Sequence, residues 1–206
     1  SHLRLNRILH IAWESLREPL FFKYNLLAAL TYAAVMALLT VASFLFEHEL
    51  GLSPAEFGAT MLGLSFVYMF GAFVNGKLLH YFTMAQLVRN GIVVMWLSCI
   101  FLLVDTLFFS LSYWGLVSFI ALLWLGCSAL FANNSSIAFS VINKNIGVSS
   151  ALFNTVQILF AAIITAAISA FSAYSTVPLS VFMLGICLGL TALFNWKIQS
   201  KEGIKL

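Results

Sequence analysis

Residues 24–46 read YNLLAALTYAAVMALLTVASFLF, a run of 23 positions without a charged side chain between Lys23 and Glu47. The hydrocarbon core of a bilayer is about 30 Å thick, and a helix of about 20 apolar residues crosses it. This run is long enough to cross with some tilt. It therefore predicts a membrane-spanning helix.

The rest of the chain shares this apolar character. Hydrophobic residues make up 62% of the 206 positions and charged residues 8%, and the mean hydropathy is +1.02. Such a composition predicts an all-α integral membrane protein and excludes a nucleic-acid-binding domain. Cys99, Cys127 and Cys187 lie in apolar stretches without the spacing of a metal site. We therefore expect no metal and no cofactor.

Polar turns divide the chain into six spans. After the first span, the sequence places span two at 57–74, span three at 85–109 and span four at 114–141. A break at 172–178 divides the uncharged stretch between Lys144 and Lys197 into spans five and six. The transmembrane domain then covers 21–197 and is followed by a polar tail at 198–206.

The segment before the first span has a different pattern. Residues 3–18 (LRLNRILHIAWESLRE) carry apolar side chains at helical spacing, with the arginines largely on the other side. This pattern is typical of an amphipathic helix at the membrane surface, and a solvated linker is the alternative. We assign residues 1–20 to such a linker helix.

Positive charges fall on one side of this six-span arrangement. With alternation at each span, all Lys and Arg residues lie on the face of the N-terminus: Arg4, Arg7, Arg17, Lys23, Lys77, Arg89, Lys144, Lys197, Lys201 and Lys205. The acidic residues Glu47, Glu49 and Glu56 lie on the opposite face. Because cytoplasmic loops are rich in Lys and Arg, both termini are expected in the cytoplasm.

Two stripes of polar side chains lie inside the apolar spans. Asn133 and Ser136 share a face of span four, and Asn154 and Gln157 continue a stripe in span five that begins at Ser150. Polar groups in hydrocarbon are costly unless they find partners or face a wet cavity. The stripes therefore predict one polar wall of a substrate cavity, and hydrogen bonding between helices is the alternative.

Span one and span three add further candidates. Tyr32, Met36 and Thr40 share one face of span one and would suit an amphipathic organic ligand, or simply pack there. Asp105 is the one acidic residue inside a span. It is a candidate proton or cation site, although its position near the outer end also suits an anchoring role.

Catalytic patterns are missing from the spans. An intramembrane serine protease needs a histidine base inside the membrane, and all four histidines lie outside the expected spans. The sequence has no HExxH pattern and no phosphate-binding glycine loop. We therefore do not expect an enzyme.

Several local patterns resemble the C-terminal six-helix half of a major facilitator superfamily transporter, and bicyclomycin-resistance-type multidrug exporters in particular. They are the start of span two at 52–58 (LSPAEFG), Ala132 and Asn133 in span four, and 147–152 (GVSSAL) followed by Gln157 in span five. The stretch 71–77 (GAFVNGK) is similar to the cytoplasmic latch of that superfamily. Gly71, Asn75 and Lys77 would form this latch, with Asn75 in its acidic position.

The resemblance implies two three-helix repeats in a bacterial inner membrane, with spans one, two, four and five facing a central cavity. It also implies proton-coupled efflux of a small organic molecule by alternating access. A partner is then required, either an N-terminal six-helix half or a second copy. The alternative is a module that does not transport and docks a partner protein through its polar helix face.

Overall fold

The computed structural model describes residues 2–108, 112–142, 145–170 and 176–197, and within these it contains helices and no strands. The N-terminal helix α1 covers His2–Arg17, and α2 covers Pro19–Ser43 and continues into the π-helix η1, Phe44–Glu49. The remaining helices are α3 (Pro54–Leu78), α4 (Met84–Phe108), α5 (Tyr113–Ser140), α6 (Ile146–Ala170) and α7 (Thr176–Asn195). The expected tail at 198–206, and parts of the expected turns at 109–111, 143–144 and 171–175, lie outside the described residues.

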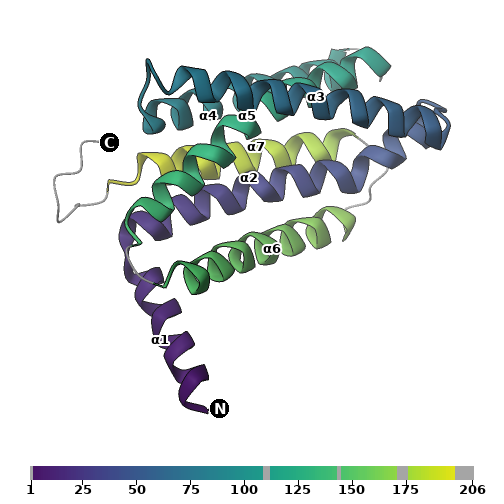
Figure 1. Ribbon diagram of the computed structural model, residues 1–206. Coiled ribbons are helices and arrows are strands. Elements are labelled where there is room, and N and C mark those ends of the chain that lie inside the picture. Colours follow the sequence, from purple (N-terminus) through teal and green to yellow (C-terminus); the bar gives the residue numbers. More distant parts are fainter. Residues whose placement is uncertain (1, 109–111, 143–144, 171–175, 198–206) are drawn as a thin grey trace.

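Six of these helices are long and apolar enough to cross a membrane, the first being α2 together with η1. The prediction of an all-α membrane protein with six spanning helices is thus confirmed. Figure 1 shows the six helices side by side, with α1 leaving one end of the bundle at an angle. We call that end the N-terminal face and the other end the acidic face.

Local sequence signals explain where the helices begin. Ser53 and Glu56 form a capping box at the start of α3, where Pro54 occupies the first turn. Thr83 and Gln86 exchange the equivalent pair of hydrogen bonds, at 2.9 and 3.3 Å, before α4. These caps satisfy backbone N–H groups that a helix start leaves without partners.

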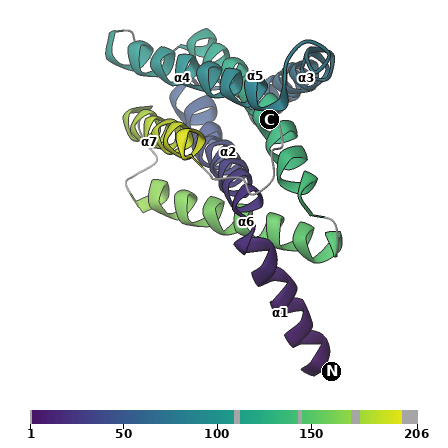
Figure 2. The same ribbon diagram turned by 90° about the vertical axis from the view of Figure 1, so that its left-hand side faces the viewer.

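Helix α2 lies at the centre of the bundle. It contacts α5, α6 and α7, and its buried face is rich in alanine and leucine. Helix α4 packs on α5 and α7, whereas α3 packs mainly on α5. Figure 2 shows α3 and α6 at separate edges of the bundle, with α5 running between them.

Close approach of α4 and α5 depends on two glycines. A Cβ atom on Gly126 would lie 3.0 Å from the carbonyl oxygen of Gly91, and one on Gly91 would lie 2.9 Å from a side-chain carbon of Leu130. Small residues at a helix crossing let the two backbones pack closely, as is common in membrane bundles. This pair therefore fixes the distance between α4 and α5.

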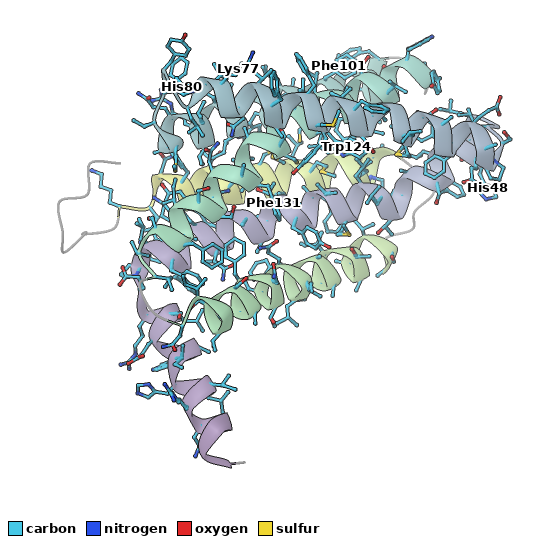
Figure 3. All side chains as sticks on the ribbon, viewed as in Figure 1. His48, Lys77, His80, Phe101, Trp124 and Phe131 are labelled. Carbon is cyan, nitrogen blue, oxygen red and sulfur yellow. The ribbon has the colours of Figure 1, made fainter. Side chains whose placement is uncertain are left out.

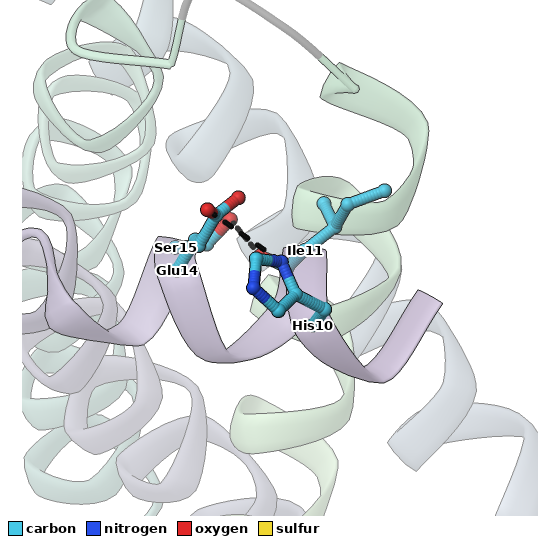
Figure 4. Close-up of polar contacts among 4 residues, drawn as sticks. All are labelled: His10, Ile11, Glu14 and Ser15. Atoms are coloured by element: carbon cyan, nitrogen blue, oxygen red, sulfur yellow. Dashed lines mark hydrogen bonds and ion pairs between the residues drawn. The ribbon is translucent and has the colours of Figure 1, made fainter. Parts of the chain in front are cut away.

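Helix α1 docks on the bundle through one serine. Ser15 is buried, and its hydroxyl donates to the carbonyl of Ile11 at 3.0 Å (Figure 4). The hydroxyl of Ser15 also lies 2.9 Å from the hydroxyl of Ser149 in α6. Because the proton of Ser15 is used by Ile11, Ser149 is the donor in the second bond. On the exposed side, His10 and Glu14 form a pair at 3.5 Å that is too solvated to add much stability.

The charged residues that the structure describes divide between the two faces as the sequence predicts. Figure 3 shows Lys77 and His80 at the N-terminal face and His48 at the acidic face. Glu47 and Glu49 lie in η1 and Glu56 lies in the first turn of α3, so all three belong to the acidic face. Which face is cytoplasmic stays a prediction.

Candidate functional site

Hydroxyl groups of the spans are mostly satisfied by their own helices. Ser136 donates to the carbonyl of Ala132 at 2.8 Å, and Thr40 donates to the carbonyl of Met36 at 2.8 Å. Thr155 makes the same kind of bond one turn back in α6. Such bonds let a hydroxyl face lipid or another helix without further partners. These hydroxyls by themselves therefore do not indicate a bound ligand.

Asn133 is engaged in the contact between α3 and α5. Its side-chain amide donates to the side-chain oxygen of Asn75 in α3 at 2.8 Å and to the carbonyl of Ala129 at 2.8 Å. Both asparagines are buried, with exposed fractions of 2% for Asn133 and 5% for Asn75. Asn133 therefore points towards α3.

Three other buried amides have atoms without hydrogen-bond partners among the described residues. Both polar side-chain atoms of Asn25 and of Asn134 lack a partner, as does the amide nitrogen of Gln157. The exposed fraction is 0% for Asn25 and Asn134 and 3% for Gln157. Leaving such a group unpaired in a buried environment costs about 1–3 kcal/mol. We call Asn25, Asn134 and Gln157 the amide cluster.

Aromatic contacts place Asn25 and Gln157 at a similar level of the bundle. The rings of Phe21 in α2, Phe139 in α5 and Phe153 in α6 lie 5.0 to 6.2 Å apart. Residues three or four apart are neighbours on a helix. Asn25 follows Phe21 by four residues and Gln157 follows Phe153 by four, so both lie one turn deeper than the three rings.

A second aromatic contact bounds this level on its deeper side. Tyr32 in α2 packs on Phe131 in α5, with ring centroids 6.4 Å apart. Asn25 and Tyr32 are seven residues apart and share a face of α2, while Asn134 lies between Phe131 and Phe139 in α5. Asn25 and Asn134 thus lie between the two aromatic contacts along their helices, and Asn25 is about 9 Å from the start of α2 at 1.5 Å per residue.

This arrangement determines the kind of chemistry that the cluster supports. Carboxamides offer hydrogen-bond donors and acceptors but no titratable proton. Aromatic rings on both sides add apolar contact area. The unpartnered atoms of the amide cluster are of the kind that pairs with an uncharged polar group or with ordered water, and none of them acts as an acid or a base.

The structure distributes the seven predicted cavity residues over different surroundings. Tyr32, Met36 and Thr40 are half-buried along one face of α2, Ser136 and Asn154 are exposed, and Asn133 and Gln157 are buried. Helix α6 packs along α2, so Gln157 and Asn133 belong to different helix contacts. The single polar wall expected from the two stripes stays a prediction. The substrate-cavity role of these seven residues stays a prediction.

Sequence reasoning passed over Asn25 and Asn134. Asn25 was one polar residue among several in span one, and Asn134 is turned about 100° from the face of Asn133. An amide inside an apolar run was the available signal in both cases. Their burial without partners became visible only from the packing of α2 against α5.

The remaining candidates, Gly71, Lys77 and Asp105, each lie against nearby residues of the bundle. Gly71 lies against α5, since a Cβ atom there would collide with the hydroxyl of Ser128, and Lys77 lies 4.6 Å from the ring centre of Phe73. The carboxylate of Asp105 lies beside Gly115 in the first turn of α5. A negative charge near a helix N-terminus is favourable, which fits an anchoring role.

Together, the fold and its charge distribution define a multi-pass α-helical membrane protein. Family models, curated proteins and solved structures contain no significant match to the chain.

Proposed function

We propose that this chain is one half of a secondary transporter that moves a small organic molecule by alternating access. The observation that carries the proposal is the amide cluster: three buried carboxamides with unpartnered atoms, contributed by three different helices. Polar groups held at membrane depth against such a cost usually mark a substrate or ion path. The resemblance to the major facilitator superfamily supports the same function.

In this proposal the path requires a second six-helix half. Helix α3 buries few of its residues, namely Leu64, Gly71 and Asn75, so most of its surface is free to face lipid or a partner. The resemblance to the major facilitator superfamily implies that transport is proton-coupled efflux. Because the amide cluster has no titratable group, the proton would bind outside it, in the partner half or at another position.

Water access to the amide cluster tests the proposal. In a background with Cys99, Cys127 and Cys187 replaced by serine, single cysteines at positions 25, 134 and 157 are exposed to a small water-soluble methanethiosulfonate. Intact cells and inverted vesicles give the two sides of the membrane. We expect the Asn134→Cys and Gln157→Cys variants to be labelled from at least one side.

Asn133→Cys is the matched control, because it neighbours Asn134 but lies in the closed contact with Asn75. It should stay unlabelled from both sides. If none of the three cluster positions is labelled, the proposal that a substrate path passes through the amide cluster is wrong. The bundle would then fit the second candidate, a module that docks a partner protein, which the largely uncovered surface of α3 favours.

A further inference from the structure

A groove lies between α3 and α5 near the acidic face and contains none of the residues of the amide cluster. Its volume is about 600 Å³, and it is lined by Leu52, Glu56, Ala59, Thr60, Gly63, Leu64, Val67, Tyr113, Val117 and Ala121. This volume is within the usual range of 300–1,000 Å³ for small-molecule sites.

The groove arises because α3 and α5 are close at one end and apart at the other. Towards the N-terminal face they meet at Gly71 and at the bond between Asn75 and Asn133. Towards the acidic face, small residues leave space between them, and a Cβ atom on Gly63 would meet no atom within 4 Å. The groove is therefore a wedge that widens towards the acidic face.

An aromatic wall closes one side of the wedge. Tyr113 packs against Trp114, with ring centroids 5.1 Å apart, and against Phe46, at 6.0 Å. Its hydroxyl lies 3.0 Å from that of Thr60, which donates its own proton to the carbonyl of Glu56. Tyr113 is therefore the donor to Thr60, and this bond holds the ring in place.

The mouth of the groove carries a negative charge. One oxygen of the Glu56 carboxylate accepts bonds from the backbone N–H and the hydroxyl of Ser53, both at 2.8 Å. The carboxylate is thereby held in position at the mouth, with its second oxygen available. Glu47 and Glu49 lie at the same face, whereas the described Lys and Arg side chains lie at the opposite one.

We propose that this groove binds an amphipathic organic cation, with its positive group near Glu56 and Tyr113 and its apolar body between α3 and α5. An acidic mouth is complementary to a positive charge and repels an anion. Aromatic faces attract cations through their quadrupole. The apolar floor, made of Leu64, Val67 and Val117, provides the area that an apolar body needs.

Binding of two ions of the same shape and opposite charge tests the proposal. The full chain, purified in a neutral detergent, is titrated with tetraphenylphosphonium and separately with tetraphenylborate. We expect saturable binding of the phosphonium and no saturable binding of the borate. Equal binding of both ions would overturn the selection for a cation.

Two variants address the lining, each with a matched control. Glu56→Gln keeps the capping box, since glutamine serves in it as well as glutamate, but removes the charge. It should weaken binding about fivefold, the size of a solvent-exposed charge interaction. Glu49→Gln removes a charge from the same face outside the groove and should change the affinity less than about twofold.

Gly63→Leu fills the groove and should abolish saturable binding. Gly58→Leu is its control, because position 58 is on the same helix, also meets no atom within 4 Å, and does not line the groove. Unchanged binding in the Gly63→Leu variant, or equal loss in both leucine variants, would overturn the groove as the site. Competition by added phosphatidylethanolamine would instead identify a lipid amine as the occupant and overturn the small-molecule assignment.

Discussion

The side-chain amide of Asn133 donates a hydrogen bond to the side-chain oxygen of Asn75 at 2.8 Å, and both residues are buried between α3 and α5. This side-chain bond joins two spanning helices. The sequence pattern predicted different sites for its two residues. Asn75 was expected in a cytoplasmic latch and Asn133 in a substrate cavity. The bond makes them one structural unit at the closed end of the wedge.

The first prediction concerns this pair. Asn133→Ala leaves the oxygen of Asn75 without its donor, and we expect a loss of about 1 kcal/mol in the free energy of unfolding, typical of polar pairs in membrane bundles. The double variant Asn75→Ala with Asn133→Ala should lose less than the sum of the two single variants. Unfolding of the purified chain in mixed micelles measures these differences.

Ser136→Ala is the control for the first prediction, because the hydroxyl of Ser136 donates within its own helix, to the carbonyl of Ala132. Its effect should stay below about 0.5 kcal/mol. Additive losses in the double variant would contradict a direct interaction between the two asparagines.

The second prediction concerns the crossing of α4 and α5. A Cβ atom on Gly126 would lie 2.9 Å from a side-chain carbon of Met95, 3.0 Å from the carbonyl oxygen of Gly91 and 3.2 Å from the backbone nitrogen of Met95. Backbone atoms cannot move aside as a flexible side chain can. Gly126→Ala should therefore destabilise the fold by about 1–3 kcal/mol, measured by the same unfolding experiment.

Gly185→Ala in α7 provides the comparison for Gly126→Ala. A Cβ atom at position 185 would meet no atom within 4 Å. Because alanine favours a helix over glycine by about 1 kcal/mol, this variant should be neutral or slightly more stable. Equal destabilisation by both alanines would show that close packing at Gly126 is not the cause.

The third prediction concerns the docking of α1. The hydroxyl oxygens of Ser15 and Ser149 are 2.9 Å apart, so cysteines at both positions bring two thiols close enough for a disulfide. In the background without native cysteines, mild oxidation should cross-link this pair. Mass spectrometry after alkylation of free thiols measures the fraction that is cross-linked.

Trp13→Cys combined with Ser149→Cys is the control for the third prediction. Trp13 is 56% exposed, on a different side of α1 from Ser15. This pair should keep both thiols free. Similar cross-linking of the two pairs would mean that α1 rotates or detaches and does not dock through Ser15.

The fourth prediction concerns the end of α7. The Lys23 ammonium group donates to the carbonyl oxygens of Phe194 at 2.7 Å and Trp196 at 3.0 Å, so a side chain of α2 caps a helix distant in sequence. Lys23→Met removes this cap. We expect amide hydrogen exchange in the last turn of α7 to become about tenfold faster, as for the loss of one charged hydrogen bond.

Lys23→Arg should retain slow exchange, because arginine also offers a positive charge and several donors to the C-terminal carbonyls. Exchange in the distant first turn of α3 serves as the internal reference for both variants. If Lys23→Met leaves the last turn of α7 unchanged, the cap does not contribute to its stability.

The sequence by itself determined the class of protein and the positions of the helices. Uncharged runs of about 20 residues are required by the thickness of the bilayer, so runs such as 24–46 predict spans from composition alone. Start signals such as Ser53, Pro54 and Glu56 are local as well, because a capping box involves residues only three apart. Both kinds of signal can be recognised in a single stretch of sequence.

Only the tertiary structure decided which side chains meet. The sulfur atoms of Cys99 and Cys187 are 3.4 Å apart, although the two residues are 88 positions apart in the sequence. Asn75 pairs with Asn133 across 58 positions. In the apolar spans, nearly every face of a helix is hydrophobic, so periodicity does not show which face turns to a neighbour. Small residues such as Gly91 and Gly126 determine how closely the helices approach one another. This packing brings Asn133 to Asn75 and buries Asn25 and Asn134 without hydrogen-bond partners among the described residues.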